Sequence, residues 1–172
     1  MTANPGDELL DRLDESGRVI GTISRRELRG TRIPHRCAYM LLFNSRGELF
    51  IHQRTATKDT HPGYWDVCVG GLPSAGESFD QAIRREAEEE IGVVVEPERL
   101  FPIHYRDARS IVYGMVYRAV HDGPFRFQPE EVARGEFVSL ADGIAGTERE
   151  AFCPDGMAVL AEYRRRYGEG KS

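Results

Sequence analysis

The chain reads GLPSAGESFDQAIRREAEEEIGV from Gly71 to Val93, a pattern that predicts a glycine turn followed by a helix starting at Gly76-Glu77-Ser78. Four glutamates gather near the C-terminal end of this helix. Carboxylates are disfavoured there because the peptide dipoles give a helix a negative C-terminus. Glu86 and Glu90 also form a like-charged i,i+4 pair, which costs about 0.2–0.5 kcal/mol in an isolated helix. A segment that breaks two local rules is a candidate functional site.

Helical geometry predicts that Glu86 and Glu90 lie at the edge of the core. At about 100° per residue, with Glu86 at zero, Glu90 falls at about +40°. The apolar residues Phe79, Ile83, Ala87 and Ile91 fall between about +20° and +140°. Two carboxylates beside a buried stripe need a cation or a raised pKa. The simpler alternative is a charged, solvated helix face, which is what most Glu-rich runs are.

The spacing of the fixed residues resembles the Nudix box, the signature of a family of diphosphate-cleaving hydrolases. The matching residues are Gly71, Glu77, Arg85, Glu86, Ala87, Glu89, Glu90, Gly92 and Val93. Only Ala87 departs, as a small residue in an aliphatic position, and the pattern is far more specific than a lone glycine motif. The resemblance implies an α/β (α+β) fold, an α/β/α sandwich with a mixed sheet. It also implies a metal-dependent hydrolase that cleaves a diphosphate linked to another moiety.

Three glutamates of this helix are the candidate metal ligands, because side chains at i, i+3 and i+4 can converge on one point. Mg²⁺ prefers oxygen and is usually bound by one or two carboxylates plus substrate phosphates and water. The expected cofactor is Mg²⁺, with Mn²⁺ as a substitute, and it would lower the pKa of an attacking water. The resemblance makes Glu86 and Glu90 the firmest ligands, and Glu89 a ligand or the catalytic base.

The resemblance also assigns supporting roles. Glu77 is expected to pair with Arg85 and hold the loop against the helix, so both join Glu86 and Glu89 in the catalytic set. Gly70 and Gly71 let the backbone approach the metal and substrate closely.

From His35 to Gly92 the chain also resembles the branch of Nudix proteins that includes isopentenyl diphosphate isomerase. The shared residues are His35-Arg36, Leu42-Phe43-Asn44, Gln53-Arg54, Lys58 and Pro62-Gly63-Tyr64-Trp65. The isomerase needs a cysteine and a histidine where this chain has Gly70 and Leu72, and Cys68 is two residues from the cysteine position. Of the isomerase's histidine ligands His35 matches one, and Leu28 stands at its partner's position. Hydrolysis is therefore favoured over isomerisation, and the complete set of glutamates disfavours a silent nucleotide-binding domain.

Arg54 and Lys58 match phosphate-contacting positions of the isomerase, and a guanidinium fork with a point charge suits a diphosphate. The alternative is two exposed basic side chains in a loop. Trp65 could stack on a base or sugar, although a lone Trp after a Pro-Gly turn more often packs. Glu130 and Glu131 could supply a further carboxylate or base, with a solvated turn as the simpler interpretation.

Composition sets broader expectations. With 172 residues and 28 acidic against 23 basic residues, the chain predicts one domain over 1–172 and no surface for a long nucleic acid. Cys37, Cys68 and Cys153 show no disulfide or zinc spacing, which suits a reducing cytoplasm. No apolar run is long enough to span a membrane, and no signal peptide is visible. The expected partner is a small-molecule diphosphate, and a homodimer stays open.

The remaining elements follow from periodicity and turn residues. An N-terminal hairpin is expected over 8–22, a short capped helix from Ser24, and a second hairpin whose strands flank residues 45–48. Short strands are expected over 66–69 and 136–140, longer strand-like segments over 100–106 and 111–121, and a C-terminal amphipathic helix over 155–167.

Overall fold

A computed structural model describes residues 4–141 and 151–168 of the chain. The elements are a 3₁₀ helix η1 (Pro5–Asp7), β1 (Leu9–Leu13), β2 (Val19–Ser24), α1 (Arg25–Leu28), β3 (His35–Phe43), β4 (Leu49–Arg54), β5 (Trp65–Asp66), β6 (Val69–Gly71), α2 (Phe79–Ile91), β7 (Glu98–Arg106), β8 (Ile111–Val120), β9 (Val132–Val138) and α4 (Pro154–Tyr167). Both expected hairpins, the short capped helix and the two long helices α2 and α4 are present. The secondary structure predicted for these segments is therefore confirmed.

Seven strands form a mixed sheet. Along its main path the order is β5-β4-β3-β8-β7, while β6 pairs with β3 and β9 pairs with β4. Only β3 and β8 pair in parallel among these strands. The turn between β3 and β4 is closed by Asn44, whose Oδ1 accepts hydrogen bonds from the backbone N–H groups of Arg46 and Glu48 at 3.0 and 2.9 Å. The predicted mixed-sheet fold is confirmed.

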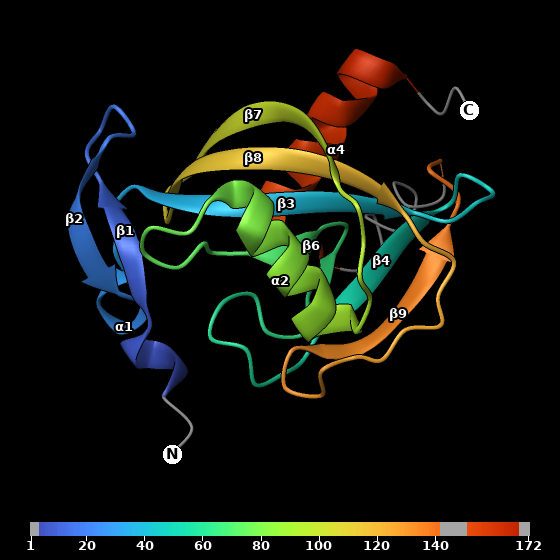
Figure 1. The fold of residues 1–172 in the computed structure, drawn as a ribbon, viewed down its shortest axis with the longest axis horizontal. Coiled ribbons are helices and arrows are strands. Elements are labelled where there is room, and N and C mark those ends of the chain that lie inside the picture. The colour runs from blue at the N-terminus through green and yellow to red at the C-terminus, as the bar shows by residue number, and fades with distance from the viewer. Residues whose placement is uncertain (1–3, 142–150, 169–172) are drawn as a thin grey trace.

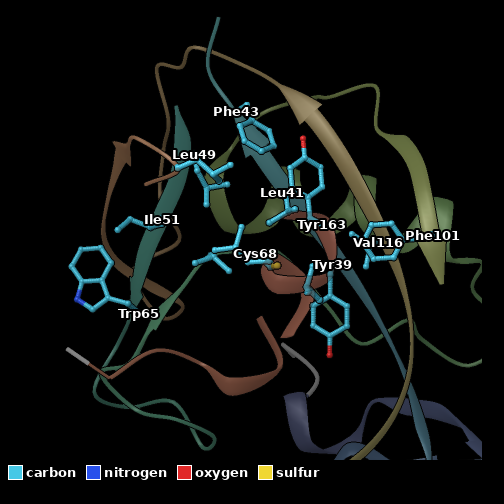
Figure 2. Packing of buried hydrophobic residues seen from close by; sticks show 14 of the residues in the cluster. Tyr39, Leu41, Phe43, Leu49, Ile51, Trp65, Cys68, Phe101, Val116 and Tyr163 are labelled. Atoms are coloured by element: carbon cyan, nitrogen blue, oxygen red, sulfur yellow. The ribbon is translucent and has the colours of Figure 1, made fainter. Parts of the chain in front are cut away.

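The sheet separates two apolar clusters. On one face Ala82, Ile83, Ala87 and Ile91 of α2 pack against Met40 and its neighbours on β3. The other face packs Val159, Leu160 and Tyr163 of α4 against alternate β3 residues. Figure 1 shows α2 in front of the sheet and α4 behind it, and Figure 2 shows part of the cluster on the α4 face.

Residues 5–32, which we call the N-terminal unit, stand beside the main sheet. Strands β1 and β2 form their own two-stranded antiparallel sheet, seen at the left of Figure 1 with α1 below it. Leu10, Ile23 and Leu28 form a small buried cluster, against which Ile33 and Leu72 pack. This cluster joins the unit to the loop that precedes α2.

The prediction of a single strand over 66–69 is wrong in one respect, because this segment contributes to two separate strands. Trp65–Asp66 pairs with β4, whereas Val69–Gly71 pairs with β3. Between them the backbone N–H of Cys68 donates to Asp66 Oδ1 at 2.9 Å, so the side chain replaces ladder hydrogen bonds where the chain changes neighbour. The late strand begins at Val132, four residues before its expected start.

Candidate active site

Helix α2 presents Glu86 and Glu90 on its buried side. It begins at a capping box, in which Ser78 Oγ accepts from the Gln81 N–H at 3.1 Å and Gln81 Oε1 accepts from the Ser78 N–H at 3.0 Å. It ends at Gly92, which adopts the left-handed conformation with φ +68°. Glu86 and Glu90 are only 7% and 8% exposed. The predicted position at the core edge is confirmed, and a fully solvated acidic face is excluded.

Two glycines bring strand β6 against these carboxylates. A Cβ on Gly71 would lie 2.6 Å from Glu86 Oε1, and a Cβ on Gly70 would lie 2.0 Å from the Ala38 carbonyl oxygen. Gly70 also has φ +151°, a conformation that L residues rarely adopt. Its N–H donates to Glu90 Oε2 at 3.4 Å. Gly71 therefore lets β6 lie close to Glu86 of α2, whereas Gly70 lets β6 lie close to the backbone of β3.

The two glycines predict different mutant phenotypes. Gly70→Ala forces a methyl group into a backbone carbonyl and is expected to lower the free energy of unfolding by more than about 2 kcal/mol. Gly71→Ala meets only the end of a side chain, so it should cost less stability while displacing the Glu86 carboxylate and lowering activity. Urea unfolding of both variants checks this order. An equal or reversed loss of stability would contradict it.

Arg85 ties the acidic residues together. Its Nε and Nη2 donate to the two oxygens of Glu77, both at 2.9 Å, and Nη1 donates to Glu86 at 3.0 Å and Glu89 at 3.1 Å. Nη2 also reaches the Leu72 carbonyl at 3.3 Å. Burial alone would raise the pKa of Glu77. The hydrogen bonds from Arg85 and from the Ser74 N–H nevertheless hold that pKa below its usual value. The expected Glu77–Arg85 pair is present in the structure.

Glu86 and Glu90 are buried carboxylates with too little positive charge nearby to offset their own negative charges. Burial raises the pKa of Glu86, against the opposing charge of Arg85. Burial, the charge of Glu86 and then that of Glu131 raise the pKa of Glu90. A buried like-charged pair is the environment in which a divalent cation is stabilising, and an oxygen donor set suits Mg²⁺. These two residues therefore fit the expected metal.

Glu89 does not converge with them. Its side chain is 53% exposed and faces Arg85. Within residues 4–141 and 151–168, no three His, Cys, Asp or Glu side chains are grouped closely enough to hold a metal ion. The structure thus brings together two of the three expected ligands.

A cleft of about 1340 Å³ opens over these residues, and Arg54, Lys58, Glu86, Glu89 and Glu90 all line it. Lys58 forms an ion pair with Glu131. The guanidinium of Arg54 donates to the carbonyl and hydroxyl of Thr60 at 3.1 and 3.2 Å. Both candidate phosphate ligands therefore lie in the same cleft as the glutamates.

Glu130 and Glu131 lie in a turn, as the simpler interpretation predicts, and Glu130 is exposed, but Glu131 is not fully solvated. Its side chain is 30% exposed and lies in the cleft, paired with Lys58 and close enough to Glu90 to raise its pKa. The segment before it is fixed to the end of α2, because the N–H of Gln128 donates to the Glu90 carbonyl at 3.0 Å. No local sequence pattern marks this contact.

Trp65, expected to stack on substrate, lies in the core instead. It is 4% exposed, belongs to the cluster on the α4 face, and is not among the residues that line the cleft. Figure 2 shows it at the edge of that cluster, near Ile51. The guanidinium of Arg134 lies 4.9 Å from its ring centroid. Packing, the simpler alternative for a lone Trp, describes it better.

The same cleft is also lined by Tyr39, Asp66 and Asp155, a second polar group that the sequence did not reveal. There the Tyr39 hydroxyl donates to Asp155 Oδ2 at 2.9 Å, and Asp66 lies close by. Burial, followed by the charge of Asp155, raises the pKa of Asp66 to about 7. These residues come from β3, β5 and α4, so only the fold brings them together.

The raised pKa of Asp66 predicts a pH dependence of stability. In an unfolded chain Asp titrates near about 3.9, so between about pH 4 and pH 7 the folded state holds a proton that the unfolded state has released. The free energy of unfolding should therefore fall as pH rises through this window. Asp66→Asn removes this titration and should gain stability relative to the wild type from pH 5 to pH 8. Thermal unfolding across that range checks this, and parallel wild-type and mutant profiles would contradict it.

Comparison with known proteins identifies relatives along most of the chain. Residues 33–154 match the family model described as the NUDIX domain. The chain is 36% identical over 160 residues to the uncharacterized Nudix hydrolase PA4841 of Pseudomonas aeruginosa, covering 91% of this chain and 93% of that protein. It is 38% identical over 161 residues to a Nudix hydrolase of Streptomyces coelicolor, SCO1686, covering 92% and 89%.

Solved structures agree with these relatives. The crystal structure of DR0079 from Deinococcus radiodurans superposes with a TM-score of 0.80 at 29% identity, covering 93% of this chain and 99% of that one. The NUDIX domain of Shewanella oneidensis NrtR, solved with ADP ribose, has the same fold, with a TM-score of 0.61 at 22% identity over 77% of this chain and 88% of that one. No helix in the described ranges has the length and apolarity needed to cross a membrane. The matched domain, the similarity along nearly the whole chain and the glutamate-bearing helix together place this protein in the Nudix hydrolase family.

Proposed function

We propose that this hydrolase is a metal-dependent diphosphohydrolase, which cleaves a diphosphate linkage in a small molecule by attack of water on phosphorus. The observation that carries this proposal is the buried pair Glu86 and Glu90, which lies against Gly70 and Gly71 in the cleft. Two carboxylates that are buried without sufficient positive charge are well suited to bind a cation and poorly suited to a purely structural role.

Each side chain around this pair has a proposed role. Glu86 and Glu90 would hold Mg²⁺, or Mn²⁺ in its place. When bound, the metal would neutralise the diphosphate and supply a water of lowered pKa. Arg85 fixes the orientation of Glu86, and Glu77 fixes Arg85 through the two hydrogen bonds at 2.9 Å.

The base that accepts the water's proton is Glu89 or Glu131. Glu89 is exposed and would have to leave Arg85 to act, while Glu131 lies in the cleft and affects Glu90 directly. Lys58 and Arg54 would bind the phosphate oxygens. Because Lys58 pairs with Glu131, a phosphate at Lys58 would release that carboxylate.

A nucleoside diphosphate linked to a second moiety is the proposed substrate class. The NrtR domain of the same fold was solved with ADP ribose, and the cleft exceeds the roughly 300–1,000 Å³ of typical small-molecule pockets. Tyr39, Asp66 and Asp155, which line the same cleft, would face the moiety beyond the diphosphate. A cytoplasmic location and a homodimer stay predictions.

The isomerase alternative would require a reactive Cys68. Its thiol is buried, and burial raises its pKa well above the usual value, with the charges of Asp66 and Asp155 adding to this. Such a thiol is inert at neutral pH. Hydrolysis therefore remains the better-supported reaction.

A substrate panel tests the proposed function. The wild-type protein is incubated with ADP-ribose, nucleoside diphosphate sugars, dinucleoside polyphosphates and nucleoside diphosphates, with Mg²⁺ or with a chelator. Products are separated by chromatography. Cleavage of at least one compound only in the presence of metal is the expected result, and the absence of cleavage across the panel would refute the proposal.

A further inference from the structure

Arg25 is a basic residue of the N-terminal unit that lies outside the Nudix box. It follows Ser24, the capping residue of α1, and it lines the cleft together with Glu86. Its side chain is 27% exposed. Arg25 therefore lines the same cleft as Glu86, although it belongs to a separate two-stranded unit of the chain.

Glu8 holds the Arg25 guanidinium at one edge. Its Oε2 accepts from Nε of Arg25 at 2.9 Å and lies 2.7 Å from Nη2. None of the residues in 4–141 and 151–168 accepts a hydrogen bond from Nη1 of Arg25. The guanidinium thus keeps donors for a second acceptor while one edge is fixed.

The same Glu8 is tied to the loop before α2. Its Oε1 accepts from Ser74 Oγ at 2.8 Å, and the Ser74 N–H donates to Glu77 at 2.8 Å. The N–H of Ala75 also donates to the Leu9 carbonyl at 2.7 Å. Arg25 is therefore positioned relative to Glu77 and Arg85 through a short series of hydrogen bonds.

A further ion pair of the N-terminal unit lies across the same cleft. Arg29, just after α1, forms an ion pair with Asp59, which adjoins Lys58 in the loop after β4. Arg29, Asp59 and Lys58 all line the cleft. Basic residues of the N-terminal unit thus face the loop that carries the candidate phosphate ligand.

We propose that Arg25 is a phosphate-binding residue of the cleft and that Glu8 is its positioning residue, so that the N-terminal unit completes the diphosphate site. The inference rests on the proposed function in taking the ligand to be a diphosphate. A guanidinium with free donors, in the same cleft as buried carboxylates that would hold a cation, is suited to bind the phosphate oxygens of a diphosphate. An ion pair whose only role is to attach the unit would not need to line the cleft.

The test measures binding of α,β-methylene-ADP, a non-hydrolysable diphosphate, to the full chain in Mg²⁺ by calorimetry. Arg25→Ala is expected to raise Kd by roughly tenfold to a hundredfold, the range for a lost charged hydrogen bond. Arg25→Lys keeps the charge without the fork and should fall between the wild type and Arg25→Ala. In turnover assays on a substrate identified by the panel, Arg25→Ala should raise KM more than it lowers kcat.

Arg26→Ala is the matched control. Arg26 is the next residue, is 61% exposed and pairs with Asp7 outside the cleft. The Kd of the Arg26→Ala variant for the analogue should therefore stay within about twofold of the wild-type value. Equal losses in the two alanine variants, or no change in Arg25→Ala, would overturn the proposal. If Arg25→Ala does not fold, the Kd of Arg25→Lys is the deciding measurement. A Kd equal to that of the wild type would then overturn the proposal. A wild type that binds the analogue but cleaves nothing in the panel would count against the proposed function and not against Arg25.

Discussion

Glu90→Gln is expected to lower kcat/KM for metal-dependent hydrolysis by at least about 10³-fold, which corresponds to roughly 4 kcal/mol of transition-state stabilisation. Glu90 is buried against Gly70 and shares its site with Glu86. The amide is nearly isosteric and can still accept the Gly70 N–H, so the loss would come from the missing charge. Initial rates at several Mg²⁺ concentrations, on a substrate identified by the panel, measure the effect.

The stability of the same variant should change in the opposite direction. Burial, with the charges of Glu86 and Glu131, raises the pKa of Glu90. An acid whose pKa is raised on folding destabilises the folded state once pH exceeds its unfolded value. In metal-free protein at pH 8, Glu90→Gln should therefore raise Tm. Mg²⁺ should raise Tm of the wild type by binding the folded state, and this increase should be lost in the variant.

Glu88→Gln is the control for both measurements. Glu88 lies on the same helix but is exposed, so the substitution changes the same charge outside the site. Its kcat/KM should stay within about twofold of the wild type, because surface substitutions of this kind have small effects. Wild-type activity in Glu90→Gln, or an equal loss in Glu88→Gln, would exclude Glu90 as a metal ligand.

Much of the fold was predictable from local pattern. The β3–β4 hairpin follows from an apolar run, the turn residues at 45–48 and a second apolar run. Helix α2 follows from its Ser78–Gln81 box, its apolar stripe and Gly92. The two buried glutamates were predictable for the same reason, since the angular position of a residue on a helix follows from its number alone.

The errors have a common physical cause. Whether Trp65 faces substrate or core depends on where the chain stops pairing with β4 and starts pairing with β3. That change of partner strand was not visible in the sequence. Glu131 reaches the cleft only because the segment from Arg126 to Gln128 donates hydrogen bonds to the last carbonyls of α2. Asp155 lies on the last helix of the described chain, far in sequence from its partner Tyr39. Contacts between distant elements leave no periodic signal.

Glu77 and Arg85 differ from these cases because the spacing of a known motif predicted their contact. The structure adds the reason that the spacing matters. The loop 72–77 carries Glu77 and is held on its other side by the N-terminal unit, where the Gly76 N–H donates to Asp11 Oδ1 at 3.1 Å. Arg85 therefore connects helix α2 to a loop that also contacts the N-terminal unit.

Arg85→Lys is accordingly expected to lower kcat by about 10²-fold, the effect of displacing a catalytic group by roughly 1 Å. The ammonium of Lys cannot form the paired hydrogen bonds to Glu77 while also contacting Glu86 and Glu89. Glu86 would lose its fixed orientation, yet the positive charge would remain. Stability should fall by about 1–3 kcal/mol, the range for lost charge-assisted hydrogen bonds. Steady-state kinetics and urea unfolding measure the two effects.

Arg84→Lys separates this role from a general loss of guanidinium. Arg84 is the preceding residue, is 49% exposed, and contacts only the Asp80 carbonyl and Glu96, both at 3.3 Å, among the described residues. Its substitution should leave kcat unchanged and stability within about 0.5 kcal/mol. If Arg85→Lys lost stability but kept the wild-type kcat, Arg85 would only hold the loop, and the orientation of Glu86 would have to come from Gly71 and the helix alone.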